Sequence, residues 1–297
     1  MVLALRKQSS YIRREGEIAR GGWCNGCGAR LSAEVRWWGA GASRHSPGTA
    51  HAYGPAWRLC ARCYEEKARC GACGVPVRGE GFLLAEGSQV YCRPCFEERP
   101  HCEICGRPGE PDRRTRPDSR QLCGPCRSTA VVDPGHAHAL YRRVRSDLRR
   151  TLGLQLRTPC QLKLAGRRQM GRLIDKTTLR HMDEGSRGRC FGLFLREGQH
   201  RAIFVEYGLP QIVLLEVLAH EYAHAWASEN CPHDLPIPIQ EGFAEWVAYK
   251  LLTRWGCKRR TARMIRRLDL YGRGLQTVLG WEREGGVEGV FRRIAKF

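Results

Sequence analysis

No part of this 297-residue sequence is apolar for long enough to cross a membrane. The longest apolar stretch, residues 212–219, is interrupted by Glu216 and is far shorter than the roughly 20 residues that a membrane-spanning helix needs. The first ten residues, MVLALRKQSS, contain too short an apolar run for a secretory signal, which needs roughly seven to fifteen such residues. We therefore expect a cytoplasmic protein with no membrane partner.

Lysine is also scarce, although the chain is strongly basic. Only seven of the 50 basic residues are lysine, and with 30 acidic residues the formal charge is +20. The excess is similar in the two halves, +11 over residues 1–150 and +9 over residues 151–297. Because the charge is dispersed rather than gathered into one basic arm, we do not expect nucleic acid to be a partner.

Cysteine, by contrast, is abundant, with 16 residues, and twelve of them lie between positions 24 and 126 in CxxC pairs. In a reducing cytoplasm, clustered cysteines indicate metal binding rather than disulfides. The pairs are Cys24/Cys27, Cys60/Cys63, Cys70/Cys73, Cys92/Cys95, Cys102/Cys105 and Cys123/Cys126.

Two CxxC pairs separated by a hairpin-sized loop place four thiolates around one tetrahedral zinc ion. Between Cys73 and Cys92 lie 18 residues, and between Cys105 and Cys123 lie 17, so six pairs predict about three structural zinc sites. The segments between the pairs are rich in Gly, Pro and charged residues. We therefore expect no hydrophobic core in this region, and metal binding should supply its folding energy.

The stretch over residues 70–126 resembles LIM domains. It has their double-knuckle rhythm, with an aromatic residue before the second knuckle and Phe96 directly after Cys95. It departs from them in the six residues between Cys95 and Cys102, a longer spacer than LIM domains have. The resemblance implies that the modules recognise protein, so we expect a regulatory protein partner there.

After Cys126 the composition becomes that of an α+β domain. Residues 211–229 are apolar on nearly every face, which predicts a buried helix. β-Branched and aromatic residues predict short strands around this helix. The other expected elements are a linker at 128–139, helices at 140–152 and 239–255, strands at 154–156, 161–164, 191–195 and 201–207, and a tail at 258–297 in which basic helical segments alternate with Gly-rich turns.

The buried helix contains the sequence HEYAH, an HExxH motif. His220 and His224 are four residues apart and share a helix face, so their imidazoles converge on one metal ion. Glu221 lies one position round the helix, where its carboxylate can act as general base on a water molecule. Polar groups in so apolar a helix cost free energy unless something pairs them.

A catalytic zinc ion needs a third protein ligand. The predicted ligand is Glu241, seventeen positions after His224, and this resembles the gluzincin metallopeptidases, whose third ligand is a glutamate on the following helix. Glu245, one turn further on, would hold a ligating histidine by its second nitrogen. An alternative assignment exchanges the roles of Glu241 and Glu245, and Glu216 is a further candidate to support a histidine.

The strand at 201–207 is expected at the sheet edge, where it would pair with substrate as an added strand. Tyr249 and Tyr271 are candidates to donate a hydrogen bond to the tetrahedral oxyanion, and packing is the alternative role for each.

The segment over residues 204–243 resembles a peptidase family. FVEYGLP before the helix, VLAHEYAHAW within it and QEGF after it resemble the plant DA-one family of LIM-associated, ubiquitin-activated zinc peptidases and its bacterial relatives. With the LIM-like modules, the resemblance extends over about residues 70–255. It implies a zinc peptidase with His220, His224 and Glu241 as ligands and Glu221 as base. No acidic ubiquitin-interacting helix is evident in the sequence, so ubiquitin activation is not expected.

The sequence thus predicts an α+β zincin-like metallopeptidase domain preceded by small four-cysteine zinc modules. Its expected cofactors are one catalytic zinc ion and about three structural ones, and its substrate a protein or peptide. The alternative is a non-catalytic zinc-finger adaptor or nucleic-acid-binding regulator, which the basic charge and the modules motivate. The expected domains are a tail at 1–20, a four-cysteine module at 21–68, a LIM-like double module at 69–130, a linker and connecting helix at 131–150, and the peptidase domain at 151–297.

Overall fold

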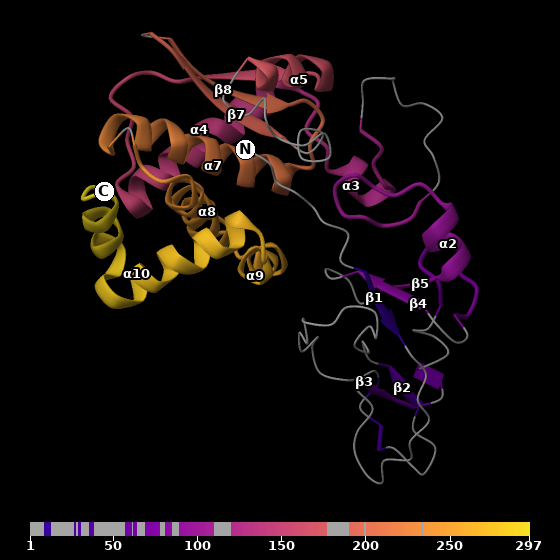
Figure 1. The fold of residues 1–297 in the computed structure, drawn as a ribbon. Helices are drawn as coiled ribbons and strands as arrows, with labels where there is room; N and C mark the ends of the chain where they lie inside the picture. The colour runs from indigo at the N-terminus through magenta and orange to yellow at the C-terminus, as the bar shows by residue number, and fades with distance from the viewer. Residues whose placement is uncertain are drawn as a thin grey trace. The chain divides into compact units, whose positions relative to one another are not determined.

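The computed structural model describes residues 9–12, 27, 29–30, 36–38, 57–60, 62–63, 69–77, 81–84, 89–109, 120–176, 190–198, 200–232 and 234–297. The chain divides into two compact units. The cysteine-rich unit contains the described part of Arg6–Arg114 together with Gln121–Cys123. The helical unit contains Arg120 and Gly124–Phe297 (Figure 1).

The cysteine-rich unit consists mainly of short antiparallel strands. Strands β1 (Ser9–Ile12), β4 (Gly81–Leu84) and β5 (Val90–Cys92) form a sheet in the order β1-β4-β5. A separate pair joins β2 (Arg36–Trp38) to β3 (Trp57–Leu59). Helix α2 (Arg93–Glu98) follows β5 directly, with a proline in its first turn, where the missing N–H costs nothing.

A small hydrophobic core lies between β4, β5 and α2. Phe82 of β4 stacks on Phe96 of α2 with ring centroids 4.1 Å apart, and Val90 is fully buried beside them. Two cysteines, Cys70 and Cys95, belong to the same cluster of buried residues. The expectation that this region has no core of its own is therefore wrong, because alternate strand residues supply one around the thiols.

The helical unit contains a three-stranded mixed sheet. Strand β6 (Gln161–Ala165) runs parallel to β8 (His200–Glu206), and β7 (Gly192–Glu197) runs antiparallel to β8, so the order is β6-β8-β7. The strand expected at the edge, 201–207, is therefore central, and that prediction is wrong. The tight turn at Gly198 (φ 58°) adds β7 to one side of β8, while the crossover through α5 (Arg167–Asp175) brings β6 to the other.

Helices α7 (Gln211–Asn230) and α8 (Ile237–Arg254) form the centre of this unit. Both are buried on nearly every face, which was expected for 211–229; for 239–255 only a helix was expected. A proline precedes each at the N-cap. Helix α7 packs against the sheet, against α8 and against α4 (Pro134–Leu152). Helix α8 packs in turn against α9 (Lys258–Arg266) and α10 (Leu270–Ile294) (Figure 1).

Helices α8 and α10 cross at two glycines. A Cβ on Gly242 would lie 2.6 Å from the carbonyl carbon of Gly274, so the crossing is possible only because neither residue has a side chain. The expectation of Gly-rich turns in this tail is wrong for most of α10, which stays helical through its glycines. The exception is Gly286, whose φ of 65° interrupts the helix.

Two further expectations are corrected between the cysteines and the sheet. Part of the linker expected at 128–139 is helical, because Asp133 caps α4 by accepting a hydrogen bond from the His136 N–H, and Pro134 suits the first turn. Residues 154–156 form no strand. The chain turns there at Gly153 (φ 67°), and Leu154 packs into the core instead of pairing.

No helix in the described part of the chain is both long and apolar enough to span a membrane.

Candidate active site and metal centres

The HExxH residues lie in the middle of α7, where α8 runs alongside. His220 and Glu221 are buried, and the His224 side chain is 15% exposed. Glu241 and Glu245 are one turn apart on α8, and both are buried. Residues four apart share a helix face, so α7 presents its two imidazoles toward the glutamates of α8.

Three ligand atoms converge between these helices. The Nε2 atoms of His220 and His224 are 2.9 Å apart, and Glu241 Oε2 lies 3.2 Å from the first and 3.6 Å from the second. A tetrahedral zinc ion with bonds of about 2.0–2.1 Å holds its ligands about 3.4 Å apart. The observed separations bracket that value, and two imidazoles with one carboxylate are a donor set that zinc accepts. The residues therefore fit a zinc ion.

The electrostatics of the cluster favour a positive charge. Burial alone would lower the pKa of His220, but Glu241 and Glu245 raise it to about 9. Burial would likewise raise the pKa of Glu241, but the two histidines hold it well below its usual range. Surroundings that stabilise a buried imidazolium also stabilise a metal cation shared by the same atoms.

Glu221, the next residue of α7 after His220, is held by β7. Its Oε2 accepts a hydrogen bond of 2.9 Å from the backbone N–H of Phe194. Its Oε1 is buried and has no hydrogen-bond partner among the described residues. Gly192 allows this approach, since a Cβ there would lie 2.9 Å from Glu221 Cγ. One carboxylate oxygen is thus fixed by a hydrogen bond, while the other has no partner among the described residues.

Glu245 lies against the opposite nitrogen of His220. Its Oε1 is 3.5 Å from His220 Nδ1, which has no hydrogen-bond partner among the described residues, and 3.2 Å from Arg267 Nη1. Glu241 therefore lies with the two Nε2 atoms, and Glu245 lies on the Nδ1 side of His220. Exchanging the two roles would require both carboxylates to move.

The other candidates from the sequence lie less close. Glu216 forms its ion pair with Arg260 of α9. The ring of Tyr271, in the first turn of α10, is 6.3 Å from the ring of His220 between centroids, whereas no described contact joins Tyr249 to either histidine.

The cysteines form three clusters, in each of which the Sγ atoms lie within 4.8 Å of one another. Cys24 lies outside the described residues, so the first cluster has three described members. None of the described cysteines forms a disulfide. The clusters are Cys27, Cys60 and Cys63; Cys70, Cys73, Cys92 and Cys95; and Cys102, Cys105, Cys123 and Cys126.

The two complete clusters begin with the same turn. The N–H groups of Cys70 and Cys102 donate to the carbonyl five residues further on, at 2.8 and 2.9 Å, and their own carbonyls accept from the glycine four residues on. These glycines, Gly74 and Gly106, have φ of 73° and 72°, the left-handed region that favours glycine. The turn holds both thiols of a CxxC pair on one side, as zinc-binding knuckles require.

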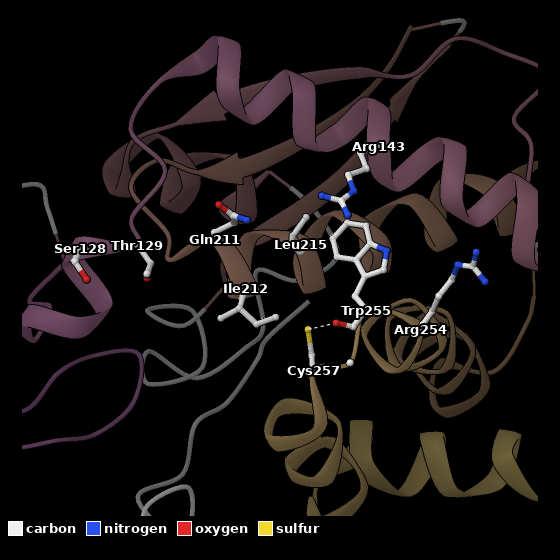
Figure 2. Close-up of a pocket in the computed structure, with 10 residues that line it drawn as sticks. Ser128, Thr129, Arg143, Gln211, Ile212, Leu215, Arg254, Trp255 and Cys257 are labelled. Carbon is white, nitrogen blue, oxygen red and sulfur yellow. Dashed lines mark hydrogen bonds between the residues drawn. The ribbon is translucent and has the colours of Figure 1, made fainter.

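A groove of about 870 Å³ lies elsewhere in the helical unit, between α4, the start of α7 and the end of α8 (Figure 2). The Arg143 guanidinium stacks on the Trp255 ring, 4.4 Å from its centre. None of the site residues expected from the sequence lines this groove, and its described residues supply no metal-ligand set. The cluster between α7 and α8 is therefore the better candidate active site.

Several residues of the site could not be read from the motif. Arg267 reaches it from the end of α9, and no local pattern marks this residue. Gly192 carries a weak signal, because a glycine inside a strand pattern often marks a close approach of another chain segment. The Phe194 N–H carries no signal, since any residue supplies a backbone donor.

Comparison with known proteins points to the same segment. Residues 192–268 match the family model described as DA1-like, Protein DA1. The chain is 29% identical over 167 residues to Protein DA1-related 2 of Arabidopsis thaliana, covering 46% of this chain and 31% of that protein. It is 27% identical over 164 residues to Protein DA1 of the same plant, covering 46% and 30%. It is 24% identical over 161 residues to LIM domain-containing protein HDR3 of Oryza sativa subsp. japonica, covering 44% and 32%.

No solved structure matches the chain. The matches span about a third of the length of these plant relatives. The family match begins at the first residue of β7 and continues through α7, α8 and α9 to residue 268, the position after Arg267. The segment that holds His220, Glu221, His224 and Glu241 is therefore DA1-like.

Proposed function

We propose that this chain is a zinc-dependent metallopeptidase of the gluzincin type, with a zincin-like catalytic domain that hydrolyses peptide bonds of a protein substrate. The observation that carries the proposal is the convergence of His220 Nε2, His224 Nε2 and Glu241 Oε2, with Glu221 buried at the position of α7 that follows His220. This combines a complete metal-ligand set with a base that has one free oxygen.

His220, His224 and Glu241 would hold the zinc ion. When bound, zinc supplies a Lewis acid that polarises the scissile carbonyl and makes a water molecule acidic. Glu221 takes the proton of the attacking water at Oε1 and passes it to the leaving amine. The Phe194 N–H keeps Oε2 in place, so the carboxylate stays oriented while Oε1 exchanges the proton.

We place the substrate along the edge of β7 that faces away from β8, where no described strand pairs with it. The Glu206 N–H donates to the Phe191 carbonyl at 2.8 Å, which makes these residues a hydrogen-bonded pair. Pairing alternates along antiparallel strands, so Gly192, Phe194 and Arg196 direct their backbone groups away from β8. On this side the Phe194 N–H reaches Glu221. An extended peptide added to this edge would pass beside the base.

The cysteine clusters are assigned to about three structural zinc ions. A site closed by four thiolates has no open position for substrate, so its role is to stabilise the fold. The relative HDR3 is named as a LIM domain-containing protein, which supports protein recognition or regulation by these modules. Clustered cysteines, none of them in a disulfide among the described residues, further support a reducing, cytoplasmic setting.

The second candidate is a zinc-module adaptor without catalysis. The cysteine clusters favour it, because they are suited to zinc whether or not the site on α7 is active. The two candidates differ in one requirement, since only the peptidase needs Glu221 to accept a proton.

Zinc content measured on the intact full-length protein by native mass spectrometry tests the metal sites. We expect four zinc ions per chain, falling to three in the double variant His220→Ala/His224→Ala. A count of two or fewer, or one that the double variant does not lower, contradicts the assignment.

Glu221→Gln tests the chemistry. Purified wild-type and variant chains are incubated with a peptide library prepared from a digested lysate, and newly formed N-termini are counted by mass spectrometry. General-base catalysis contributes about 10²–10⁴-fold, so we expect cleavage to fall by at least about 10²-fold with zinc content unchanged. Equal cleavage by both proteins would exclude Glu221 as the base, and no cleavage by the wild type would favour the adaptor.

A further inference from the structure

Arg267, between α9 and α10, is fixed by three contacts. Its Nη1 lies 3.2 Å from Glu245 Oε1, and its Nη2 lies 2.9 Å from Asp269 Oδ2. Its guanidinium carbon is 4.7 Å from the centre of the Tyr271 ring. One edge of the guanidinium faces Asp269, another atom faces Glu245 and the flat face covers Tyr271. Only 11% of the side chain is exposed, so this arrangement is held inside the protein.

Asp269 extends this arrangement to α10. Its Oδ1 accepts a hydrogen bond of 3.0 Å from the Gly272 N–H and so caps the first turn of the helix. Gly272 packs closely on Arg267, since a Cβ there would overlap the backbone of Arg267. The guanidinium is therefore held through both its side chain and its backbone.

Glu245 transmits the position of Arg267 to the metal-ligand cluster. Its side chain is 1% exposed, and the same Oε1 atom faces Arg267 and His220 Nδ1. A carboxylate so deeply buried needs a positive partner that fixes its direction. When His220 directs its Nδ1–H to Glu245, the lone pair of its Nε2 faces Glu241 and His224.

We propose that Arg267 is a positioning residue of the metal site, which orients Glu245 so that Glu245 orients His220. The proposal rests on the proposed function, because it assumes that His220, His224 and Glu241 bind zinc. Arg267 itself has no described contact with any of the three. It acts by restricting one carboxylate, and thus one imidazole, to the geometry that binds metal.

An arginine is needed at this position, because one planar group contacts two carboxylates and an aromatic face at once. Lysine would carry the same charge on a single nitrogen and could not satisfy Glu245 and Asp269 in this geometry.

The chain offers a matched control in Arg260. It forms a buried ion pair with Glu216, which lies on α7 one turn before His220. Both arginines come from the region of α9, and both pair with a glutamate that is 1% exposed. Among the described residues, however, no hydrogen bond joins Arg260 or Glu216 to either histidine. Loss of Arg260 therefore removes a comparable buried pair without the link to the metal ligands.

The experiment compares zinc affinity in full-length Arg267→Met, Glu245→Gln, the double variant of these two, and Arg260→Met. Zinc occupancy of the site formed by His220, His224 and Glu241, here called the fourth site, is measured in zinc-buffered solutions. The variant His220→Ala/His224→Ala gives the zinc bound by the cysteine sites alone, which is subtracted. Residues that support metal ligands are worth about 10–100-fold in affinity, so Arg267→Met and Glu245→Gln should each weaken binding by about that factor. The zinc affinity of the double variant should be no lower than that of the single variant that binds zinc more weakly. Arg260→Met should bind zinc like the wild type, although its thermal stability falls.

Substituting cobalt for zinc adds a spectroscopic measurement. The visible absorption bands of cobalt at the fourth site, taken as the difference from the baseline variant, should shift in Arg267→Met and remain unchanged in Arg260→Met. If Arg267→Met does not fold, Arg267→Lys keeps the buried charge, and its zinc affinity should still fall by about tenfold.

Wild-type zinc affinity in Arg267→Met or Arg267→Lys overturns the proposal. The proposal is also overturned if the fold-reductions in zinc affinity of the two single variants multiply in the double variant, since Arg267 would then act independently of Glu245. A wild-type protein without a fourth zinc ion would instead contradict the proposed function. Four zinc ions without peptidase activity would refute only the catalytic part, because the position of His220 is measured here by zinc affinity.

Discussion

Replacing Gly274 by alanine would test how closely α10 approaches α8. A Cβ at this position would lie 2.7 Å from Gly242 Cα and 2.7 Å from the Pro238 carbonyl oxygen. Both are backbone atoms, so no side-chain rotation can relieve the overlap. Non-bonded carbon atoms ordinarily approach to about 3.5–4.0 Å, so the two helices would have to separate by roughly 1 Å.

Two opposing effects decide how much Gly274→Ala changes the free energy of unfolding. Alanine is favoured over glycine inside a helix by about 1 kcal/mol. Overpacking costs about 1–3 kcal/mol, and an overlap with backbone belongs at the upper end of that range. We therefore expect Gly274→Ala to lower the free energy of unfolding by about 1–2 kcal/mol. For a unit of this size that lowers Tm by about 2–8 °C, measurable by circular dichroism on heating.

Gly280→Ala in the same helix is the matched control. The nearest atom to a Cβ there is Nη2 of Arg283, 3.9 Å away at the end of a flexible side chain. Only the higher helix propensity of alanine relative to glycine remains, so this variant should be more stable than wild type by up to about 1 kcal/mol. If Gly274→Ala matches Gly280→Ala in sign and size, the close crossing of α8 and α10 does not exist.

Three further predictions concern other parts of the chain. Gly192→Ala should abolish peptidase activity but keep zinc, since its Cβ would lie 2.9 Å from Glu221 Cγ; zinc content and peptide cleavage on one sample test this. Burial would raise the pKa of Glu229, but two backbone N–H donors and Arg201 hold it below its usual range. Glu229→Gln should therefore cost about 2–4 kcal/mol at neutral pH, and the deficit in urea unfolding should shrink as the pH falls below about 4. Cys105→Ser should lose one zinc ion by mass spectrometry and leave cleavage-site preference unchanged, and an unchanged zinc count would contradict its role as ligand.

Local sequence pattern was sufficient for the elements that carry the candidate site. The apolar run with HExxH predicted α7 to within one residue at its C-terminal end, and α8 to within two residues at its start. Both helices are long, flanked by proline and uniformly buried, so their formation depends little on distant contacts. The spacing of His220 and His224 likewise brings the imidazoles together as soon as α7 forms.

The order of the strands needed information that local pattern does not contain. Residues 201–207 and 191–195 both read as half-buried strands, and only tertiary pairing decides which is central. Hairpin formation at Gly198 and the crossover to β6 make β8 central. The prediction of Gly-rich turns in α10 was wrong for a similar reason, because Gly274 permits a close helix contact rather than a turn.

The arginines of the chain take on a structural role that composition alone does not reveal. Four carboxylates of α7 and α8 are buried, those of Glu216, Glu221, Glu241 and Glu245. Arg267 pairs with Glu245, whereas no described arginine or lysine pairs with Glu221 or Glu241. Buried charge must be compensated, and a divalent cation between neutral histidines would supply the balance. The basic excess that suggested a nucleic-acid partner thus includes residues that pair with buried glutamates, Arg267 among them.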